Sequence, residues 1–442
     1  MIATVVSFAF VLGVLVFVHE LGHFMAAKRI GVRVLKFQLG FNPTILSVRR
    51  GDTEYSIGAL PLGGYVKMAG ENPEETRTGA PDEFLSRTKW ERFQVLIMGP
   101  AMNLLLAFGL TAVVLYNGAE TPVFQDQPPV VGSVTPGSPA EQSGIQPGDR
   151  IVSVADRAVS TWQQVFIGVG TRLDRPVAIR LLRNGIEETR TVTPVTTRRS
   201  RFDIGDIGVQ PMVRPKLVAV NASQPADRAG LRRGDVVADV NGQGMTSTAQ
   251  FREAIATHPA AAITIGVVRG DIRQEIVVTP DTKGDIGWIG VGIGEETKTI
   301  KPGPLEAVSM SAQENVRNAG LIFETVWGLI TLETSPKQLM GPVAIAQLSG
   351  ESAQLGWVAL FSLMAMISLN LGLLNLLPIP ILDGGHIFIM AIEGMARRDF
   401  SVRVKEKMLL AGFVVLMMLM VTVIYNDLTR VSWIGRFMPP WR

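Results

Sequence analysis

The sequence predicts a multi-pass α-helical membrane protein with four transmembrane helices and a β-rich region inserted between the second and third helices. Of its 442 residues, 47% are hydrophobic and 18% are charged, whereas soluble domains carry about 25% charged residues. Four apolar stretches approach the roughly 20 residues that a helix needs to cross a bilayer. Between the second and third stretches, short β-branched runs alternate with Gly and Pro, which is typical of strands and turns.

The four predicted spans cover residues 1–27, 93–116, 355–383 and 408–426. The first span is not expected to be a cleaved signal peptide, because it lacks a positively charged start. Lys28 and Arg29 follow it where a small-residue cleavage site would lie. We therefore expect a retained helix.

The basic residues predict the orientation in the membrane. Eleven Lys and Arg lie within residues 28–92 and five within residues 384–407, and short loops rich in these residues stay in the cytoplasm. Both termini and the β-rich region are then extracytoplasmic, which in a bacterium places them on the periplasmic side of the inner membrane. The lipid bilayer is thus the first expected partner.

Charge and cysteine content exclude other classes. The net charge of +3, without a basic arm carrying interleaved aromatic residues, predicts no nucleic-acid partner. The absence of cysteine excludes disulfides and thiolate metal ligands.

The β-rich region contains an internal repeat. Residues 138–151 align with residues 224–237 at a constant offset of 86 residues, each with a Pro-Ala start, a Gly, and Gly-Asp before Ile or Val. This pattern resembles the PDZ domains of bacterial membrane-associated proteases. We expect two such domains, at residues 127–212 and 213–294.

Residues 302–333 show the helical spacing of apolar residues that is typical of an amphipathic helix. Glu314, Arg317 and Glu324 interrupt it, so the segment is too polar to span. The prediction is a helix at the membrane surface or against the repeat pair, and a plain packing helix stays open as the alternative.

The first span carries the sequence His-Glu-Leu-Gly-His at residues 19–23. Two histidines four residues apart lie on one helical face and can share a zinc ion, with Glu20 beside it as general base. His19, Glu20 and His23 are the only ionisable residues from 2 to 27. Because ionisable groups inside a membrane are costly, they indicate function.

A third metal ligand is required, and Asp383 is the leading candidate. It follows Pro378 and Pro380 at the cytoplasmic end of the third span, at the depth of the two histidines. Asp-Gly is also ordinary turn chemistry, and His386 stays open as an alternative ligand. His258 is interpreted as a loop residue.

These motifs, together with Gly-Pro-Ala-Met-Asn at residues 99–103 and the segment from 375 to 386, resemble the site-2 protease family of intramembrane zinc metalloproteases, specifically its RseP type. The resemblance covers essentially the whole chain. It implies one zinc ion per chain on His19, His23 and Asp383, with Glu20 catalytic.

The cytoplasmic loop at residues 28–92 contains an apolar, glycine-rich segment at about 53–70. It predicts a membrane-associated β-hairpin whose open edge near Gly63 and Gly64 binds an unwound substrate helix. The resemblance implies a membrane-re-entrant β-loop here, and a small hairpin packed beneath the membrane is the alternative.

Further substrate contacts are expected in the third span. The resemblance implies this role for Asn375, Pro378 and Pro380, and we add Asn370 to the predicted set. Asn103 is interpreted as a buried hydrogen bond between helices. The PDZ pair is expected to bind peptide C-termini or to act as a size gate.

The resulting hypothesis is regulated intramembrane proteolysis of single-span membrane proteins, such as a pre-trimmed anti-sigma factor or remnant signal peptides. One rival is a non-catalytic membrane scaffold that presents tandem PDZ domains. The other is an ion or proton pathway that uses His19 and Glu20.

Overall fold

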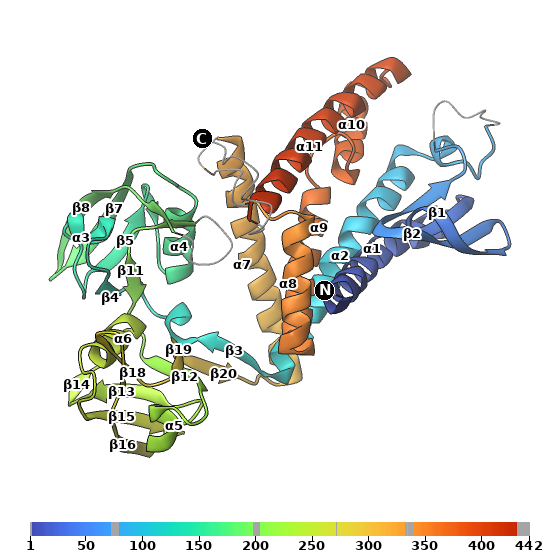
Figure 1. The fold of residues 1–442 in the computed structure, drawn as a ribbon. Coiled ribbons are helices and arrows are strands. Elements are labelled where there is room, and N and C mark those ends of the chain that lie inside the picture. Colours follow the sequence, from blue (N-terminus) through green and yellow to red (C-terminus); the bar gives the residue numbers. More distant parts are fainter. Residues whose placement is uncertain are drawn as a thin grey trace. The chain divides into compact units, whose positions relative to one another are not determined.

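The computed structural model describes residues 2–71, 79–197, 204–270, 272–331, 334 and 339–430. Some predicted segments are described only in part. The residues outside the description include 72–78 in the predicted cytoplasmic loop, 198–203 in the first repeat and 332–333 in the predicted amphipathic helix. The chain forms two compact units. Unit 1 consists of Met1–Gly118, Lys301–Val326 and Leu339–Arg442, and unit 2 of Ala119–Ile300 and Trp327–Gln338 (Figure 1).

Within the described residues, four helices of unit 1 are long and apolar enough to cross a membrane, which confirms the predicted number of spans. They are α1 (Ile2–Arg29), α2 (Lys89–Gly118), α9 (Trp357–Asn375) and α11 (Val402–Arg430). Even α9, the shortest with 19 residues, extends about 28 Å at 1.5 Å per residue, close to the roughly 30 Å of a bilayer core.

The third span ends earlier than the predicted range of 355–383. Helix α9 stops at Asn375, residues 376–382 form a turn, and α10 (Asp383–Met395) begins beyond it. Pro378 and Pro380 lie in that turn, and proline cannot continue a helix because it lacks an amide hydrogen. Asp383 therefore opens a new helix instead of ending the span.

Two further helices contribute to unit 1, one of them only up to Val326. The predicted segment 302–333 forms α7 (Pro304–Ile330), but it does not simply lie on a surface: Ser311 Oγ donates a hydrogen bond of 2.7 Å to the Phe108 carbonyl of α2. Helix α8 (Pro342–Leu355) was not predicted. The buried Asp427 carboxylate of α11 accepts hydrogen bonds from backbone amides at the start of α8, where the helix dipole favours an anion.

Small residues let α2 pack closely between α1 and α9 (Figure 1). A Cβ atom on Gly22 of α1 would lie 2.3 Å from the Met98 carbonyl oxygen of α2, and one on Gly372 of α9 would lie 2.9 Å from Leu104. Such contacts replace the hydrophobic driving force that helices lack in lipid.

The hairpin between α1 and α2 is larger than predicted. It comprises β1 (Val34–Arg50) and β2 (Thr53–Met68), so the predicted range of about 53–70 held only its second strand. Gly64 lies opposite Leu39 and Val66 opposite Phe37. Phe37 and Val66 are buried in one cluster with the end of α1, which anchors the hairpin against that helix.

Unit 2 contains two modules with matching element order. The first consists of β4 (Val131–Val134), α3 (Pro139–Gln142), β5 (Arg150–Val154), α4 (Trp162–Gly170), β7 (Val177–Arg183), β8 (Ile186–Val192) and β11 (Val209–Pro211). The second consists of β12 (Pro215–Val220), α5 (Pro225–Ala229), β13 (Val236–Val240), α6 (Thr248–Ala256), β15 (Ile263–Arg269), β16 (Ile272–Val278) and β19 (Val291–Glu295).

In each module the last strand pairs with the first, β11 with β4 and β19 with β12. Short strands complete the unit: β6 (Arg157–Ala158), β9 (Val195–Thr197), β10 (Ile204–Asp206), β14 (Gln243–Gly244), β17 (Asp281–Lys283) and β18 (Ile286–Trp288). The antiparallel pair β3 (Ala119–Pro122) and β20 (Thr297–Ile300) joins the two ends of its main segment.

Both modules repeat one buried ion pair. Arg183 donates two hydrogen bonds of 2.7 Å to Asp149, and Arg269 makes the same two bonds to Asp235. Burial raises the pKa of Asp149, but hydrogen bonds from Arg183 and the Gln146 amide outweigh it and hold that pKa below its ordinary value. The Gly-Asp of the repeat is thus a structural feature.

Candidate metal centre

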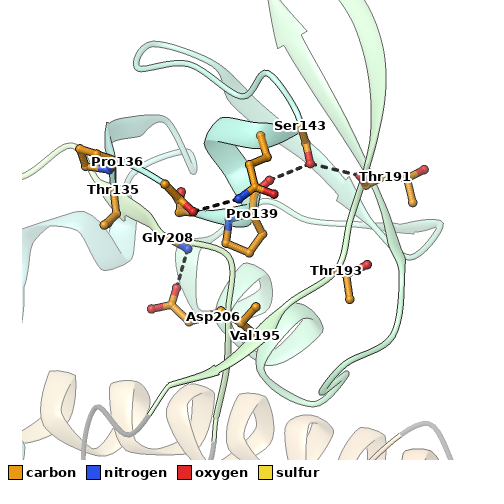
Figure 2. Close-up of a pocket in the computed structure, with 12 residues that line it drawn as sticks. Thr135, Pro136, Pro139, Ser143, Thr191, Thr193, Val195, Asp206 and Gly208 are labelled. Atoms are coloured by element: carbon orange, nitrogen blue, oxygen red, sulfur yellow. Dashed lines mark hydrogen bonds between the residues drawn. The ribbon is translucent and has the colours of Figure 1, made fainter.

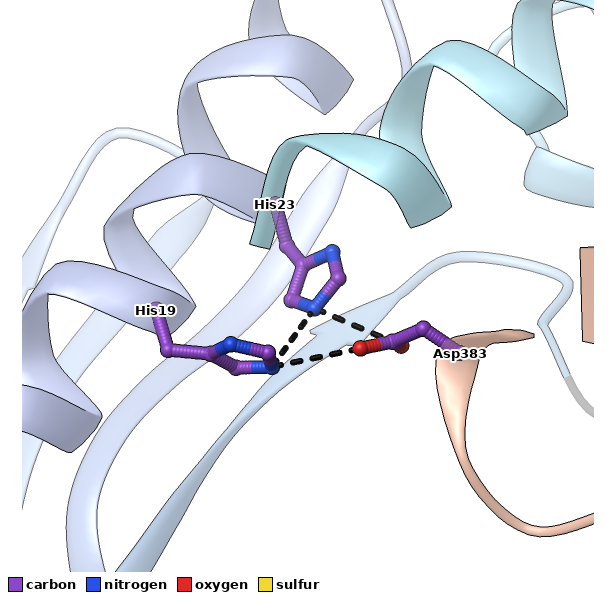
Figure 3. A group of neighbouring side chains, drawn as sticks. All are labelled: His19, His23 and Asp383. Carbon is purple, nitrogen blue, oxygen red and sulfur yellow. Dashed lines mark hydrogen bonds and ion pairs between the residues drawn. The ribbon is translucent and has the colours of Figure 1, made fainter. Parts of the chain in front are cut away.

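Helix α1 places two imidazoles side by side. His19 and His23 are one helical turn apart, and their Nε2 atoms lie 3.2 Å from each other (Figure 3). His23 is buried and His19 is half-buried. The helix ends soon afterwards at Lys28 and Arg29, so the pair lies near its basic end.

Asp383 joins the two histidines from the other end of the chain. Its Oδ2 lies 3.3 Å from Nε2 of His19, and its Oδ1 lies 3.5 Å from Nε2 of His23 (Figure 3). His386 does not belong to this group; among the described residues, His19, His23 and Asp383 are the one set of three side chains placed to hold a metal ion.

The spacing of these donor atoms fits zinc. Zinc binds imidazole nitrogen and carboxylate oxygen at about 2.0–2.2 Å in a tetrahedron, so its ligand atoms lie about 3.3–3.5 Å from each other. The two Nε2 atoms are 3.2 Å apart, and they lie 3.3 and 3.5 Å from the two different oxygens of Asp383. Taken with one ligand atom from each residue, the donor atoms all lie within 4.8 Å of one another. Three protein ligands also leave the fourth position open, as catalytic zinc sites require.

Helix α2 fixes the orientation of His23. The Nδ1 atom of His23 lies 2.8 Å from the Val95 carbonyl oxygen, which accepts its proton and leaves Nε2 with a lone pair for a metal. Gly99 provides the space, because a Cβ atom there would lie 2.2 Å from His23 Nε2. Sequence reasoning assigned neither residue a role, although Gly99 belongs to the Gly-Pro-Ala-Met-Asn motif.

Glu20 lies between the histidines and the hairpin. Its carboxylate lies close to His23, His19 and Asp383 and to the backbone of Val66 in β2. A Cβ atom on Gly64 would lie 3.2 Å from Glu20 Cγ. The hairpin therefore touches the residue beside the metal ligands.

The other predicted substrate contacts have different surroundings. A Cβ atom on Gly63 would meet the Phe41 ring within the hairpin. Asn370 donates to the Met366 carbonyl of its own helix, and Pro380 packs on Gly412 of α11. Asn375 is the half-buried last residue of α9, and Pro378 in the following turn is exposed.

A cavity of about 810 Å³ opens in the first module of unit 2 (Figure 2). Its polar groups bond to one another: Gln142 donates to Gly137, Ser143 donates to Pro139, and the Gly208 amide donates to Asp206. Among its lining residues Asp206 is the one with an ionisable side chain, so ionisable groups do not converge on this cavity as they do at the histidines.

Comparison with known proteins identifies the family of the chain. The model of peptidase family M50 matches residues 7–419. The chain is 32% identical to the regulator of sigma-E protease RseP of Salmonella typhimurium, covering 96% of this chain and 98% of that protein. The same protease of Escherichia coli is 30% identical with the same coverage. A relative from Vibrio cholerae, 33% identical, bears a name that assigns it to the zinc metalloproteases, again over 96% and 98%.

The similarity to one of the matching solved structures is weak. A PDZ domain of an SdrC-like protein from Listeria monocytogenes matches 18% of this chain and 86% of its own, at 19% identity and a TM-score of 0.17. This TM-score is too low to establish a shared fold.

Proposed function

The chain belongs to peptidase family M50, the site-2 protease family, and we propose that this metalloprotease hydrolyses peptide bonds of single-span membrane proteins within or near the membrane. One zinc ion per chain would be held by His19, His23 and Asp383. The observation that carries the proposal is the approach of these three side chains to within 3.2–3.5 Å of one another, inside a bundle of spanning helices.

Each residue has a distinct role in the reaction. When bound, zinc polarises a carbonyl group and makes a water molecule more acidic. Glu20 accepts the proton of the attacking water on its carboxylate and later gives it to the leaving amine, so the base returns to its starting state. His23 is held by Val95, and Asp383 supplies the negative charge that balances the cation.

The hairpin supplies a means of holding the substrate. A peptide bond inside a transmembrane helix must be unwound before it is cut, and its freed amides and carbonyls then need partners. From residue 60 to residue 68, β2 pairs on one side only among the described strands. Its Val66 backbone reaches Glu20, so a substrate strand added at this edge would lie beside the base.

The turn after α9 is proposed as the second substrate contact. Asn375 ends the helix, and its side-chain amide can donate to a substrate carbonyl, while the turn of residues 376–382 offers backbone groups. Pro378 is exposed and available to a substrate chain. Asn370 and Pro380 remain weaker candidates, because each already contacts its own surroundings.

The two modules of unit 2 are proposed to be PDZ domains on the periplasmic side, where both chain termini would also lie. Each has a glycine with positive φ, Gly208 (83°) or Gly290 (78°), in the turn before its last strand. Such turns bind peptide C-termini in backbone nests. In the first module the Asp206 carboxylate already accepts from the Gly208 amide, so the second module is the better site for a C-terminus.

The substrate is proposed to be a pre-trimmed anti-sigma factor or a remnant signal peptide. Relatives of this chain bear the name regulator of sigma-E protease RseP. Two large modules outside the membrane would exclude proteins whose periplasmic domain has not been removed. Each of these substrates has one span and a short extracytoplasmic part after trimming.

Cleavage by the reconstituted protein tests the proposal. The full chain in liposomes, mixed with a single-span substrate, should cut it; a zinc chelator should abolish cutting, and added zinc should restore it. A scaffold with tandem PDZ domains would cut nothing under any of these conditions. An ion pathway would change the liposome pH gradient and leave the substrate intact, and either result would overturn the proposal.

A further inference from the structure

Asn103 of α2 lies directly behind His19. Its side chain is fully buried, and its Nδ2 atom is 3.2 Å from Nδ1 of His19. The Asn103 carbonyl oxygen of the main chain accepts a hydrogen bond of 2.7 Å from Ser368 Oγ of α9. Asn103 is therefore held between α9 and the imidazole ring of His19. It contacts Nδ1, the ring nitrogen that does not face Asp383.

The amide of Asn103 is only half satisfied. Its Oδ1 atom is buried and has no hydrogen-bond partner among the described residues, which is a costly arrangement for a carbonyl oxygen. Meanwhile Nδ2, a donor, faces His19 Nδ1. This orientation assigns the single proton of a neutral His19 to Nε2, the atom that faces Asp383.

Metal binding requires the opposite arrangement of protons. A histidine that binds zinc through Nε2 must offer a lone pair there, so its proton lies on Nδ1 and needs an acceptor. A half-turn of the Asn103 amide exchanges its oxygen and nitrogen in the same space. Oδ1 then accepts from His19 Nδ1, so the buried oxygen gains a partner, while Nδ2 takes the place that Oδ1 held.

We propose that Asn103 is a positioning residue of the metal centre, whose side-chain oxygen accepts the Nδ1 proton of His19 and so fixes the ring with Nε2 toward the metal. The inference rests on the proposed zinc site. It replaces the expectation that Asn103 only links two helices. Its role parallels that of Val95, whose carbonyl oxygen lies 2.8 Å from Nδ1 of His23. Helix α2 thus orients both histidines, one through its backbone and one through a side chain.

Two substitutions separate this role from simple packing. Asn103→Leu keeps the size of the side chain but removes the acceptor, and losing such a partner typically weakens metal affinity about 10- to 100-fold. Asn103→Asp keeps an acceptor oxygen in the same place, so it should retain zinc affinity at or above that of the wild type. Ser368→Ala is the matched control, because it breaks the hydrogen bond between α2 and α9 and leaves the Asn103 amide intact.

The measurement is zinc affinity of the full-length protein in detergent, by competition with a chromophoric chelator. We expect weakened binding in Asn103→Leu, recovery in Asn103→Asp and near wild-type binding in Ser368→Ala. Unchanged zinc affinity in Asn103→Leu, or equal losses of affinity in both Asn103 variants, would overturn the inference. As long as the wild type binds zinc, either result leaves the proposed function standing. Absence of zinc binding by the wild type would overturn the proposed centre and this inference together.

Discussion

The Nε2 atom of His19 lies 3.3 Å from Oδ2 of Asp383, although one residue belongs to the first spanning helix and the other opens the helix after the third. This contact joins the two ends of the chain at one site. It depends on the turn of residues 376–382, which ends α9 and turns the chain back toward α1.

The first prediction concerns the third metal ligand. Asp383→Ala removes the only carboxylate among the three donor side chains, so zinc should fall from about one ion per chain to background. His386→Ala should keep full zinc, since His386 lies outside the group. Elemental analysis of the purified proteins measures both, and full zinc in Asp383→Ala would refute the assignment.

The second prediction concerns the space that α2 leaves for His23. In Gly99→Ala the new methyl group would lie 2.2 Å from His23 Nε2, which displaces the imidazole and should cause loss of zinc and cleavage. Gly109→Ala on the same helix is the control, because its methyl group would meet nothing within 4 Å. Equal zinc content in the two variants would contradict this account of Gly99.

The third prediction separates substrate binding from metal binding. A side chain at Gly64 would press on the Gln38 carbonyl and on Val16 and Glu20, so Gly64→Val should push the hairpin away from α1. Because displacement by about 1 Å can cost about 100-fold in rate, cleavage should fall by one to two orders of magnitude.

Zinc content distinguishes this effect from damage to the metal centre, and Gly64→Val should keep its zinc. Ser47→Val, on an exposed strand of the same hairpin, should keep both zinc and activity. Cleavage by Gly64→Val at the wild-type rate would contradict the proposal that the hairpin binds the substrate.

The fourth prediction concerns pH and the first module of unit 2. Because the folded-state pKa of Asp149 is below its ordinary value, the pair with Arg183 stabilises the module above an unfolded pKa of about 3.9. This stabilisation is lost as the pH falls through the lower, folded-state pKa.

Hydrogen exchange of the full chain at several pH values measures this dependence. Arg183→Met leaves Asp149 buried without its partner, so it should destabilise the first module at neutral pH and flatten the pH dependence below about pH 4. Protection in the second module, which has its own pair of Asp235 and Arg269, should not change. Unaltered protection of the first module in Arg183→Met would contradict this role.

The grouping of the candidate metal ligands was predictable where short patterns determine it. Two histidines four residues apart on an apolar helix indicate a metal pair by helix geometry alone, and Asp383 was identified by its position after Pro378 and Pro380. The four spans were equally clear, because a bilayer requires length and apolarity together.

The rest depended on contacts between distant segments. Nothing local to α2 indicates that Val95 and Gly99 surround His23, because their partner lies in another helix. The first hairpin strand was missed since β1 is partly charged, and α8 and α10 were missed since short helices lack the length signal of a span. The predicted buried hydrogen bond of Asn103 between helices is present, but the sequence does not indicate that its partner is His19.

The most direct test of the central claim is a paired measurement on Glu20→Gln. The substitution keeps the size of the side chain and leaves His19, His23 and Asp383 in place, but it removes the base. We predict that the purified variant retains about one zinc ion per chain and leaves a single-span substrate uncut in liposomes where the wild type cuts it. Cleavage at the wild-type rate by Glu20→Gln would contradict the account.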